Sequence, residues 1–296
     1  MGVEFLSMKS YYEYGKDSGH TDHPKQVLDL ACKVLEPIIK GNQINASHLV
    51  VATTCPDRLA PSLGQELNSY FYPVFKDSHV IDIVQGCAGG ITALLLGNKL
   101  AENNHQSVVV VIADAARKAC DKNDKDYNVF GNGAFACVLA SGNSTKGLLH
   151  YKSRQYQELT EVVNIKLGQD IGEVLTVHKD TYLNPGKYLG LQMKKDLAIS
   201  LMIKAKGFYD EFISEINIDP DILILHQVNP KIIAYLGNVF KKKGLRFINV
   251  SEMAGNCGTA SIGVALKHEE ESLLNKKVGI CSFGTGGVIT AGLWQF

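Results

Sequence analysis

The feature that most constrains the fold is the stretch from His79 to Gly97, in which a short apolar run meets an Ala- and Leu-rich segment. The run Val80–Val84 predicts a buried strand, and the segment Ala88–Leu100 predicts an apolar helix. Between them the turn Gly86-Cys87-Ala88-Gly89-Gly90 places Cys87 at a helix N-terminus. Free backbone N–H groups and the helix dipole favour a thiolate there. Cys87 is therefore a candidate nucleophile, with a buried structural cysteine as the alternative.

Size and charge limit the class of protein. The chain has 296 residues, 45% of them hydrophobic, which is enough for one large domain or two smaller ones. Lys plus Arg and Asp plus Glu both total 30, so the formal net charge is zero and does not indicate a nucleic-acid partner. The first residues lack the apolar core of a signal peptide, and the longest apolar run, Val108–Ala113, is too short to cross a bilayer. We expect neither a nucleic-acid nor a membrane partner.

The cysteines and histidines indicate the compartment and argue against a metal site. Seven cysteines form an odd set without CxxC spacing, which does not fit a disulfide framework or a zinc ribbon. This usage favours a reducing, cytoplasmic environment. The nine histidines form no HxxxH or HExxH pair, so we expect no metal.

An internal repeat divides the chain into two predicted halves, residues 1–147 and 148–296. The strand–turn–helix around Cys87 matches a second one around Asn256. Alternating helices and strands predict an α/β fold in layers, and a pseudo-dyad would bring both turns to one shared site. The alternative is a chance alignment of similar elements. The matching strands are His48–Ala52 with Asp221–Leu225, Val108–Ala113 with Lys277–Phe283, and Gly133–Ala140 with Val288–Gln295.

Three loops at predicted strand ends offer a nucleophilic set. Such loops carry the sites of α/β sheets, and here they hold Cys87, His226 and Asn256. A thiolate could hold an acyl group, while the other two donate hydrogen bonds to an oxyanion or enolate. Backbone N–H groups of Phe283–Gly287 could complete an oxyanion hole with that of Cys87. Each feature has a structural alternative: a buried hydrogen-bonded histidine, an asparagine in a turn or N-cap, and a glycine hairpin.

At these residues the chain resembles the β-ketoacyl-acyl carrier protein synthase III family of thiolase-like condensing enzymes. The likeness runs from about residue 24 to the C-terminus. It is carried by Val50-Val51-Ala52-Thr53-Thr54 with Pro56-Asp57 and Pro61-Ser62, Cys87-Ala88-Gly89, Phe130-Gly131-Asn132-Gly133-Ala134, His226-Gln227-Val228-Asn229, Gly255-Asn256 with Ala260-Ser261, and Phe283-Gly284-Thr285-Gly286.

The resemblance implies a thiolase-like αβαβα fold, with the nucleophilic cysteine in the first half and the histidine and asparagine in the second. Cys87 would take an acyl group from an acyl-CoA or an acyl carrier protein. His226 and Asn256 would bind a malonyl-type thioester and stabilise the enolate formed as carbon dioxide leaves. The acyl oxyanion would lie on the N–H groups of Cys87 and Gly286.

The resemblance also implies the surroundings of the site and the assembly. Asn229 matches an asparagine that supports the reacting groups, and Lys231 lies where the family often has a basic residue facing the carrier protein. The family is usually a homodimer, and a heteromer with a related synthase is the alternative. No metal and no redox cofactor are implied.

The chain also departs from the family. The family's opening strand and the Trp- and Arg-bearing segment after it, which helps to hold CoA, have no clear match. Asn132 replaces an aspartate and Thr285 replaces a glycine. These changes favour a relative from specialised metabolism over the housekeeping initiator of fatty acid synthesis. The broad pathway that the resemblance implies is fatty acid or polyketide biosynthesis. An acyltransferase acting on a non-carbon nucleophile and a partner subunit of a heteromeric synthase stay open as alternatives.

Overall fold

Two five-stranded mixed sheets form the framework of the protein. The computed structural model describes residues 2–14, 26–102, 106–120, 127–142, 144–167, 189–240 and 244–296. The strand order is β1-β5-β4-β2-β3 in the first sheet and β6-β12-β11-β9-β10 in the second. The strands are β1 Gly2–Glu13, β2 Ala46–Ala52, β3 His79–Ile83, β4 Ser107–Ala115, β5 Asn132–Gly142, β6 Gly147–Gln155, β9 Ile222–Leu225, β10 Arg246–Ile248, β11 Lys277–Phe283 and β12 Val288–Gln295. A further pair, β7 Val163–Leu167 and β8 Leu189–Met193, is antiparallel.

The two sheets repeat each other strand by strand. In the first sheet β2 is parallel to β3 and β4, whereas β5 is antiparallel to β4 and β1. In the second sheet β9 is parallel to β10 and β11, and β12 is antiparallel to β11 and β6. Order and direction agree at every position, so the predicted pair of related halves in an α/β fold is confirmed.

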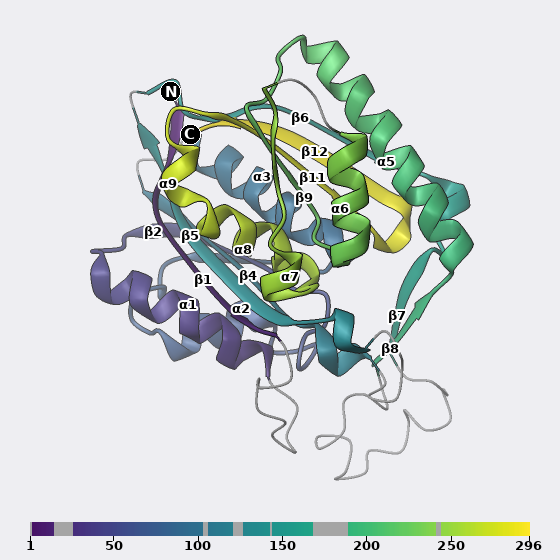
Figure 1. The fold of residues 1–296 in the computed structure, drawn as a ribbon. Helices are drawn as coiled ribbons and strands as arrows, with labels where there is room; N and C mark the ends of the chain where they lie inside the picture. The colour runs from purple at the N-terminus through teal and green to yellow at the C-terminus, as the bar shows by residue number, and fades with distance from the viewer. Residues whose placement is uncertain are drawn as a thin grey trace, which may run out of the picture.

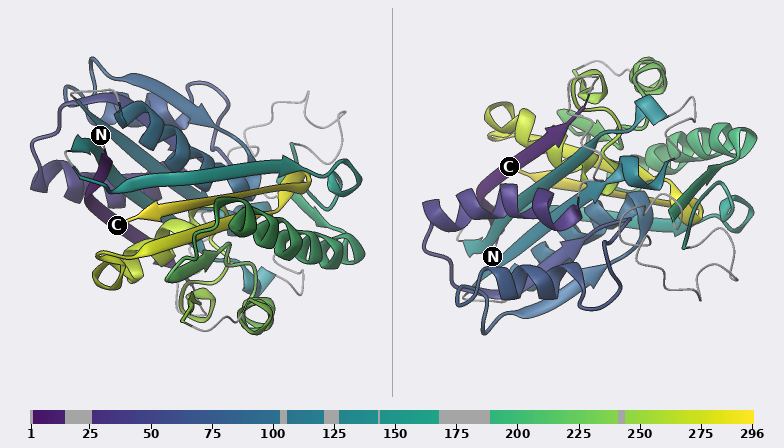
Figure 2. Two further views of the ribbon diagram at one scale, coloured as in Figure 1. Left: turned by 90° about the horizontal axis from the view of Figure 1, so that it is seen from above. Right: turned by 90° about the horizontal axis from the view of Figure 1, so that it is seen from below.

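The helices form three layers around these sheets (Figure 1). Helices α1 and α2 pack on the outer face of the first sheet, and α5 and α6 pack on that of the second, as the two turned views also show (Figure 2). Helices α3 and α8 lie between the sheets. This gives the predicted order of layers, αβαβα. The helices are α1 Val27–Gly41, α2 Leu63–Tyr70, α3 Gly89–Glu102, α5 Lys195–Ile216, α6 Pro230–Val239, α7 Ser251–Ala254, α8 Ser261–His268 and α9 Glu270–Leu273.

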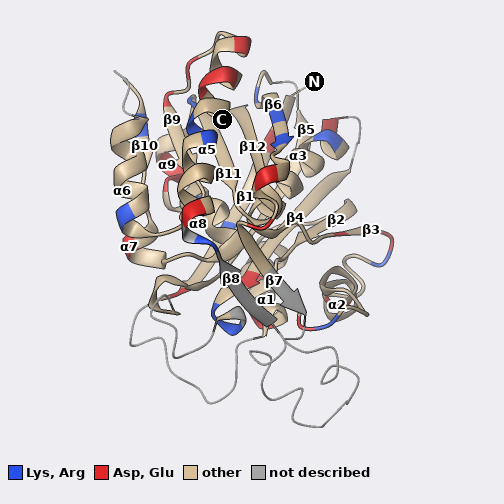
Figure 3. Cartoon of the chain, turned by 90° about the vertical axis from the view of Figure 1, so that its right-hand side faces the viewer, with Lys and Arg blue, Asp and Glu red and all other residues tan. Residues whose placement is uncertain are grey.

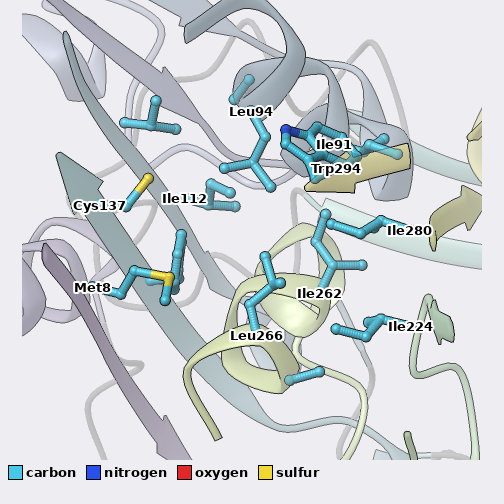
Figure 4. Packing of buried hydrophobic residues seen from close by; sticks show 14 of the residues in the cluster. Met8, Ile91, Leu94, Ile112, Cys137, Ile224, Ile262, Leu266, Ile280 and Trp294 are labelled. Atoms are coloured by element: carbon cyan, nitrogen blue, oxygen red, sulfur yellow. The ribbon is translucent and has the colours of Figure 1, made fainter. Parts of the chain in front are cut away.

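The central layer holds the core that fixes the two buried helices. Helix α3 is apolar around most of its circumference because both sheets cover it, as expected for a helix with no solvent face. Figure 4 shows Ile91 and Leu94 of α3, Ile262 and Leu266 of α8, and Trp294 of β12 in this cluster. Burying each such side chain stabilises the fold by about 1.5–3 kcal/mol. The N-termini of α3 and α8 are thereby held at fixed positions between the halves.

The N-terminal segment corrects one expectation. The sequence predicts no counterpart of the family's opening strand, whereas in the structure Gly2–Glu13 forms β1 and pairs along its length with β5. A register shift between Phe5 and Ser7 leaves Leu6 out of the pairing, and its side chain is 59% exposed. This bulge breaks the alternation by which a strand is found in a sequence. The place of the Trp- and Arg-bearing segment, between β1 and α1, falls on residues 15–25, outside the described residues.

Charged residues of both signs are spread over the outer elements in the view of Figure 3. One cluster ties α5 to the second sheet: Glu211 of α5 accepts hydrogen bonds from Lys152 at 2.6 Å and from Arg154 at 2.8 and 2.7 Å, both on β6. The hydrogen bonds from Arg154 and Lys152 lower the pKa of Glu211 to about 2. The carboxylate is therefore ionised at neutral pH and the cluster holds α5 against β6.

Candidate active site

Cys87 lies in a short 3-10 turn, Gly86–Ala88, between β3 and α3. The second half of the chain holds this turn: Ser282 Oγ donates to the Cys87 carbonyl at 2.6 Å, and Cys87 N donates to Thr285 Oγ1 at 3.3 Å. Gly86 has a φ of 54°, and a Cβ added there would lie 1.8 Å from Thr285 Oγ1. Only glycine fits this close approach.

The environment of Cys87 does not favour the thiolate expected at a helix N-terminus. Burial raises the pKa of the thiol, because the anion loses its hydration. Hydrogen bonds from the hydroxyl and the backbone of Thr285 oppose this rise, and the nearby charge of Asp114 adds to it. In the free protein desolvation therefore outweighs the helix N-terminus, and the resting group is the thiol.

His226 follows β9 and is buried, with 1% of its surface exposed. Its backbone N–H donates to the Cys281 carbonyl at 2.9 Å, and the ring meets the edge of Phe283 with 6.2 Å between centroids. Neither ring nitrogen has a hydrogen-bond partner within the described part of the chain. Burial lowers the pKa of His226 to about 4. The neutral ring keeps one N–H to donate to a bound molecule.

Asn256 belongs to the second half but is held by the first. Its N–H donates to the Val129 carbonyl and its carbonyl accepts from Gly131 N, both at 2.9 Å. Arg117 Nε in turn donates to the Phe130 carbonyl at 2.7 Å. The side-chain Oδ1 of Asn256 accepts from the backbone N–H of Gly258 at 3.0 Å. The amide orientation is thereby set, with Nδ2 as the remaining donor.

One pocket joins these three side chains. Cys87, His226 and Asn256 all line it, with Thr285 and Asn229 beside them. The structure thus brings together the residues that the sequence placed on three separate loops, and the two repeated turns meet at one site between the halves. The remaining walls are mainly apolar and include Val129, Phe130, Val162, Val163, Ala198, Leu201, Met202, Val228, Ile232 and Phe283.

The other predicted residues lie at the edge of the site or beyond it. Asn229 caps α6, its Oδ1 accepting from Lys231 N at 2.9 Å, and it lines the pocket. Lys231 is exposed at the start of α6. Gly286 is not among the pocket residues, and its carbonyl accepts from Gln155 Nε2 at 3.1 Å. Within the turn Thr285–Gly287, the residue hydrogen-bonded to Cys87 is Thr285, so the oxyanion role of Gly286 stays a prediction.

The sequence analysis missed Asp114, a fully buried carboxylate near the end of β4. It accepts from Thr53 Oγ1 at 3.0 Å, Thr54 N at 2.6 Å and Thr259 N at 2.6 Å, the last from the second half. Burial raises the pKa of Asp114, and the hydrogen bonds from these three threonines oppose the rise. The sequence signal that could have identified Asp114 is an aspartate placed directly after the apolar run Val108–Ala113. Its role is to join the two halves behind the pocket.

No group of three or more His, Cys, Asp and Glu side chains among the described residues could hold a metal ion. Within the same residues, no helix combines the length and hydropathy needed for a membrane span.

Fold and site together define a class. Two related halves in five layers, with a cysteine at a central helix N-terminus and a histidine and an asparagine from the other half in the same pocket, give the chain the thiolase-like fold.

Comparison with known proteins gives the same result. A family model described as 3-oxoacyl-[acyl-carrier-protein (ACP)] synthase III matches residues 81–156. The β-ketoacyl-[acyl-carrier-protein] synthase III of Streptococcus equi subsp. equi is 26% identical over 299 residues, covering 94% of this chain and 86% of the relative.

Solved structures agree on the fold. A 3-oxoacyl-(acyl-carrier protein) synthase from Burkholderia xenovorans has a TM-score of 0.82 at 17% identity, over 100% of this chain and 94% of that one. The priming β-ketosynthase of the R1128 polyketide pathway has a TM-score of 0.78 at 16% identity, over 100% and 96%. The chain therefore has the thiolase-like fold and is similar to synthase III proteins over most of its length.

Proposed function

We propose that the protein is a β-ketoacyl synthase III-type condensing enzyme that joins an acyl group to a malonyl-type thioester with loss of carbon dioxide. The observation that carries the proposal is the shared pocket of Cys87, His226 and Asn256 at the junction of the halves. A cysteine alone would support acyl transfer, and the two further hydrogen-bond donors supply what an enolate requires.

The first step is acyl transfer to Cys87. The thiol loses its proton, the sulfur attacks the carbonyl carbon of the donor thioester, and the tetrahedral intermediate collapses as the donor thiolate leaves and takes up a proton. Backbone N–H groups at the Cys87 turn stabilise the oxyanion during this step. The apolar walls favour a hydrophobic acyl chain or linker over a charged one.

The second step is decarboxylation of the extender. The bond between its carboxylate and the α-carbon breaks, carbon dioxide leaves, and the electron pair forms an enolate on the thioester. The neutral ring of His226 and the Nδ2 group of Asn256 donate to the enolate oxygen. The α-carbon then attacks the acyl carbonyl, a carbon–carbon bond forms, and the Cys87 sulfur leaves as the thiolate.

The partners follow from this chemistry. The names of the related synthases refer to an acyl carrier protein, and we propose an acyl carrier protein or CoA as the carrier of both substrates. Lys231, exposed at the start of α6 beside the pocket residue Asn229, would meet the acidic carrier. We further propose a homodimer and a cytoplasmic location, where the seven free cysteines would stay reduced.

Intact-mass spectrometry tests the proposal. The protein is incubated with a panel of acyl-CoA and acyl carrier protein donors, then with malonyl carrier protein, and Cys87→Ala serves as the control. A mass gain that requires Cys87, disappears on malonyl addition and yields a β-ketoacyl product is the expected result. An acyl group that persists with malonyl present and is discharged to a non-carbon acceptor would instead identify an acyltransferase. Absence of acylation with every donor would favour a partner subunit.

A further inference from the structure

The residue that distinguishes this pocket is Thr285, the first residue of the 3-10 turn Thr285–Gly287 between β11 and β12. The resemblance leads one to expect glycine there, so this chain places a hydroxyl and a methyl group where the family has none. Thr285 lines the pocket with Cys87, and the two residues are 198 positions apart in the sequence. The contact therefore crosses from the second half to the first.

Both polar functions of the Thr285 hydroxyl point to Cys87. The oxygen accepts the backbone N–H of Cys87 at 3.3 Å, and the hydroxyl is a donor to Cys87 Sγ at 3.9 Å. A hydroxyl that accepts one hydrogen bond becomes a better donor of its own proton. The Thr285 oxygen fits beside the turn because Gly86 has no Cβ, which would otherwise occupy the same space. Gly284 also packs closely against Cys87, because a Cβ at this glycine would lie 2.8 Å from Cys87 Sγ.

We propose that the Thr285 hydroxyl is a further catalytic group of this site, which holds the nucleophile by donating to the Cys87 sulfur while it accepts the Cys87 N–H. A hydrogen bond from a hydroxyl strengthens when its acceptor becomes an anion, so the interaction favours the thiolate that attacks the acyl donor. The same hydroxyl oxygen accepts the hydrogen bond of the Cys87 N–H group, to which an acyl oxygen would bind. Acylation therefore requires the side chain to release that N–H group as the acyl oxygen arrives.

Apart from the Thr285 hydroxyl, which does not titrate, two titratable groups among the described residues lie around Cys87. Asp114 of β4 lies behind the turn, and its charge opposes the thiolate. His226 lines the same pocket and is neutral at pH 7 because burial lowers its pKa to about 4. Neither group supplies a positive charge to the sulfur at neutral pH, which leaves hydrogen bonds as the means by which the site stabilises the thiolate.

The test is the pH dependence of alkylation of Cys87 by iodoacetamide, followed by peptide mass mapping, in the full chain and in Thr285→Val and Thr285→Ser. Valine is close in shape to threonine but has no hydroxyl, whereas serine keeps it. We expect the valine variant to show a midpoint about one pH unit higher and alkylation about tenfold slower at pH 8. The serine variant should stay within twofold of the parent protein.

Other outcomes overturn the proposal. An unchanged midpoint in Thr285→Val, or a change only in the plateau rate, would show that the hydroxyl does not act on the sulfur. An equal loss in Thr285→Ser would assign the effect to the methyl group. The role of Thr285 in acyl transfer rests on the proposed function, but the alkylation measurement needs no acyl donor. Failure of acyl loading would therefore contradict the proposed function and leave this result standing.

Discussion

Because His226 is buried, uncharged and without a hydrogen-bond partner among the described residues, its ring should make the stability of the protein depend on pH. The pKa of His226 is about 4 in the folded protein, against about 6.5 in an unfolded chain. Below pH 6.5 the unfolded state binds a proton that the folded state does not, so folding stability falls as the pH is lowered and levels off below about pH 4. At pH 5 this amounts to a loss of about 2 kcal/mol relative to pH 7.

The perturbation that isolates this effect is His226→Gln. Urea unfolding of both proteins at pH 7 and pH 5 can be followed by the fluorescence of Trp294, the single tryptophan, which is fully buried. The loss of unfolding free energy between the two pH values should be smaller by about 2 kcal/mol in the variant. The other eight histidines are common to both proteins, so their contribution cancels. Equal pH dependence in both would refute the assignment of a neutral, desolvated ring.

Three further predictions concern the groups around the pocket. Asn256→Ala should spare acyl loading but slow release of carbon dioxide from malonyl carrier protein by on the order of 100-fold, and normal condensation would contradict the enolate role. Gly258→Ala should lower the urea unfolding free energy by about 2–4 kcal/mol, because its φ is 55° and a Cβ would lie 2.2 Å from a buried carboxylate oxygen. Gly207→Ala on open helix surface is its control, with no loss expected. Lys118→Met removes the ammonium group that lies 2.6 Å from the carboxylate of Asp57 and should lower the unfolding free energy by about 1–2 kcal/mol in the same urea measurement, because Asp57 keeps its hydrogen bonds from Val27 N and Leu28 N.

The layers of this fold could be predicted because the halves repeat. Each half alternates apolar strands with helices and ends in two antiparallel strands, and such a pattern admits few architectures. The meeting of Cys87 with His226 and Asn256 followed from the same repeat, since the two matching turns, before α3 and before α8, line one pocket. Asn256 does not follow its strand directly, because the short helix α7 lies between β10 and the turn. Their catalytic roles came from the resemblance and await the experiments above.

Other features depended on contacts that no local pattern encodes. Strand β1 was missed because the bulge at Leu6 interrupts the alternation of its side chains. Thr285 was noted only as a departure, because its meaning lies in a contact with a cysteine 198 positions away. The thiolate expected at Cys87 was overestimated for a related reason. A helix N-terminus can be predicted locally, whereas the burial that raises the thiol pKa is produced by the second half closing over it.

The pairing of β1 with β5 also affects how the chain folds while it is being synthesised on the ribosome. Strand β1 ends at Glu13 and β5 ends at Gly142, so 129 residues must be made after the first strand before its neighbour among the described strands is complete. At about 5–20 residues per second, this interval lasts about 6 to 26 seconds. During it the nascent chain carries an unpaired strand edge, which is open to wrong partners. Chaperone capture of the emerging polypeptide should therefore be strongest until the fifth strand leaves the exit tunnel.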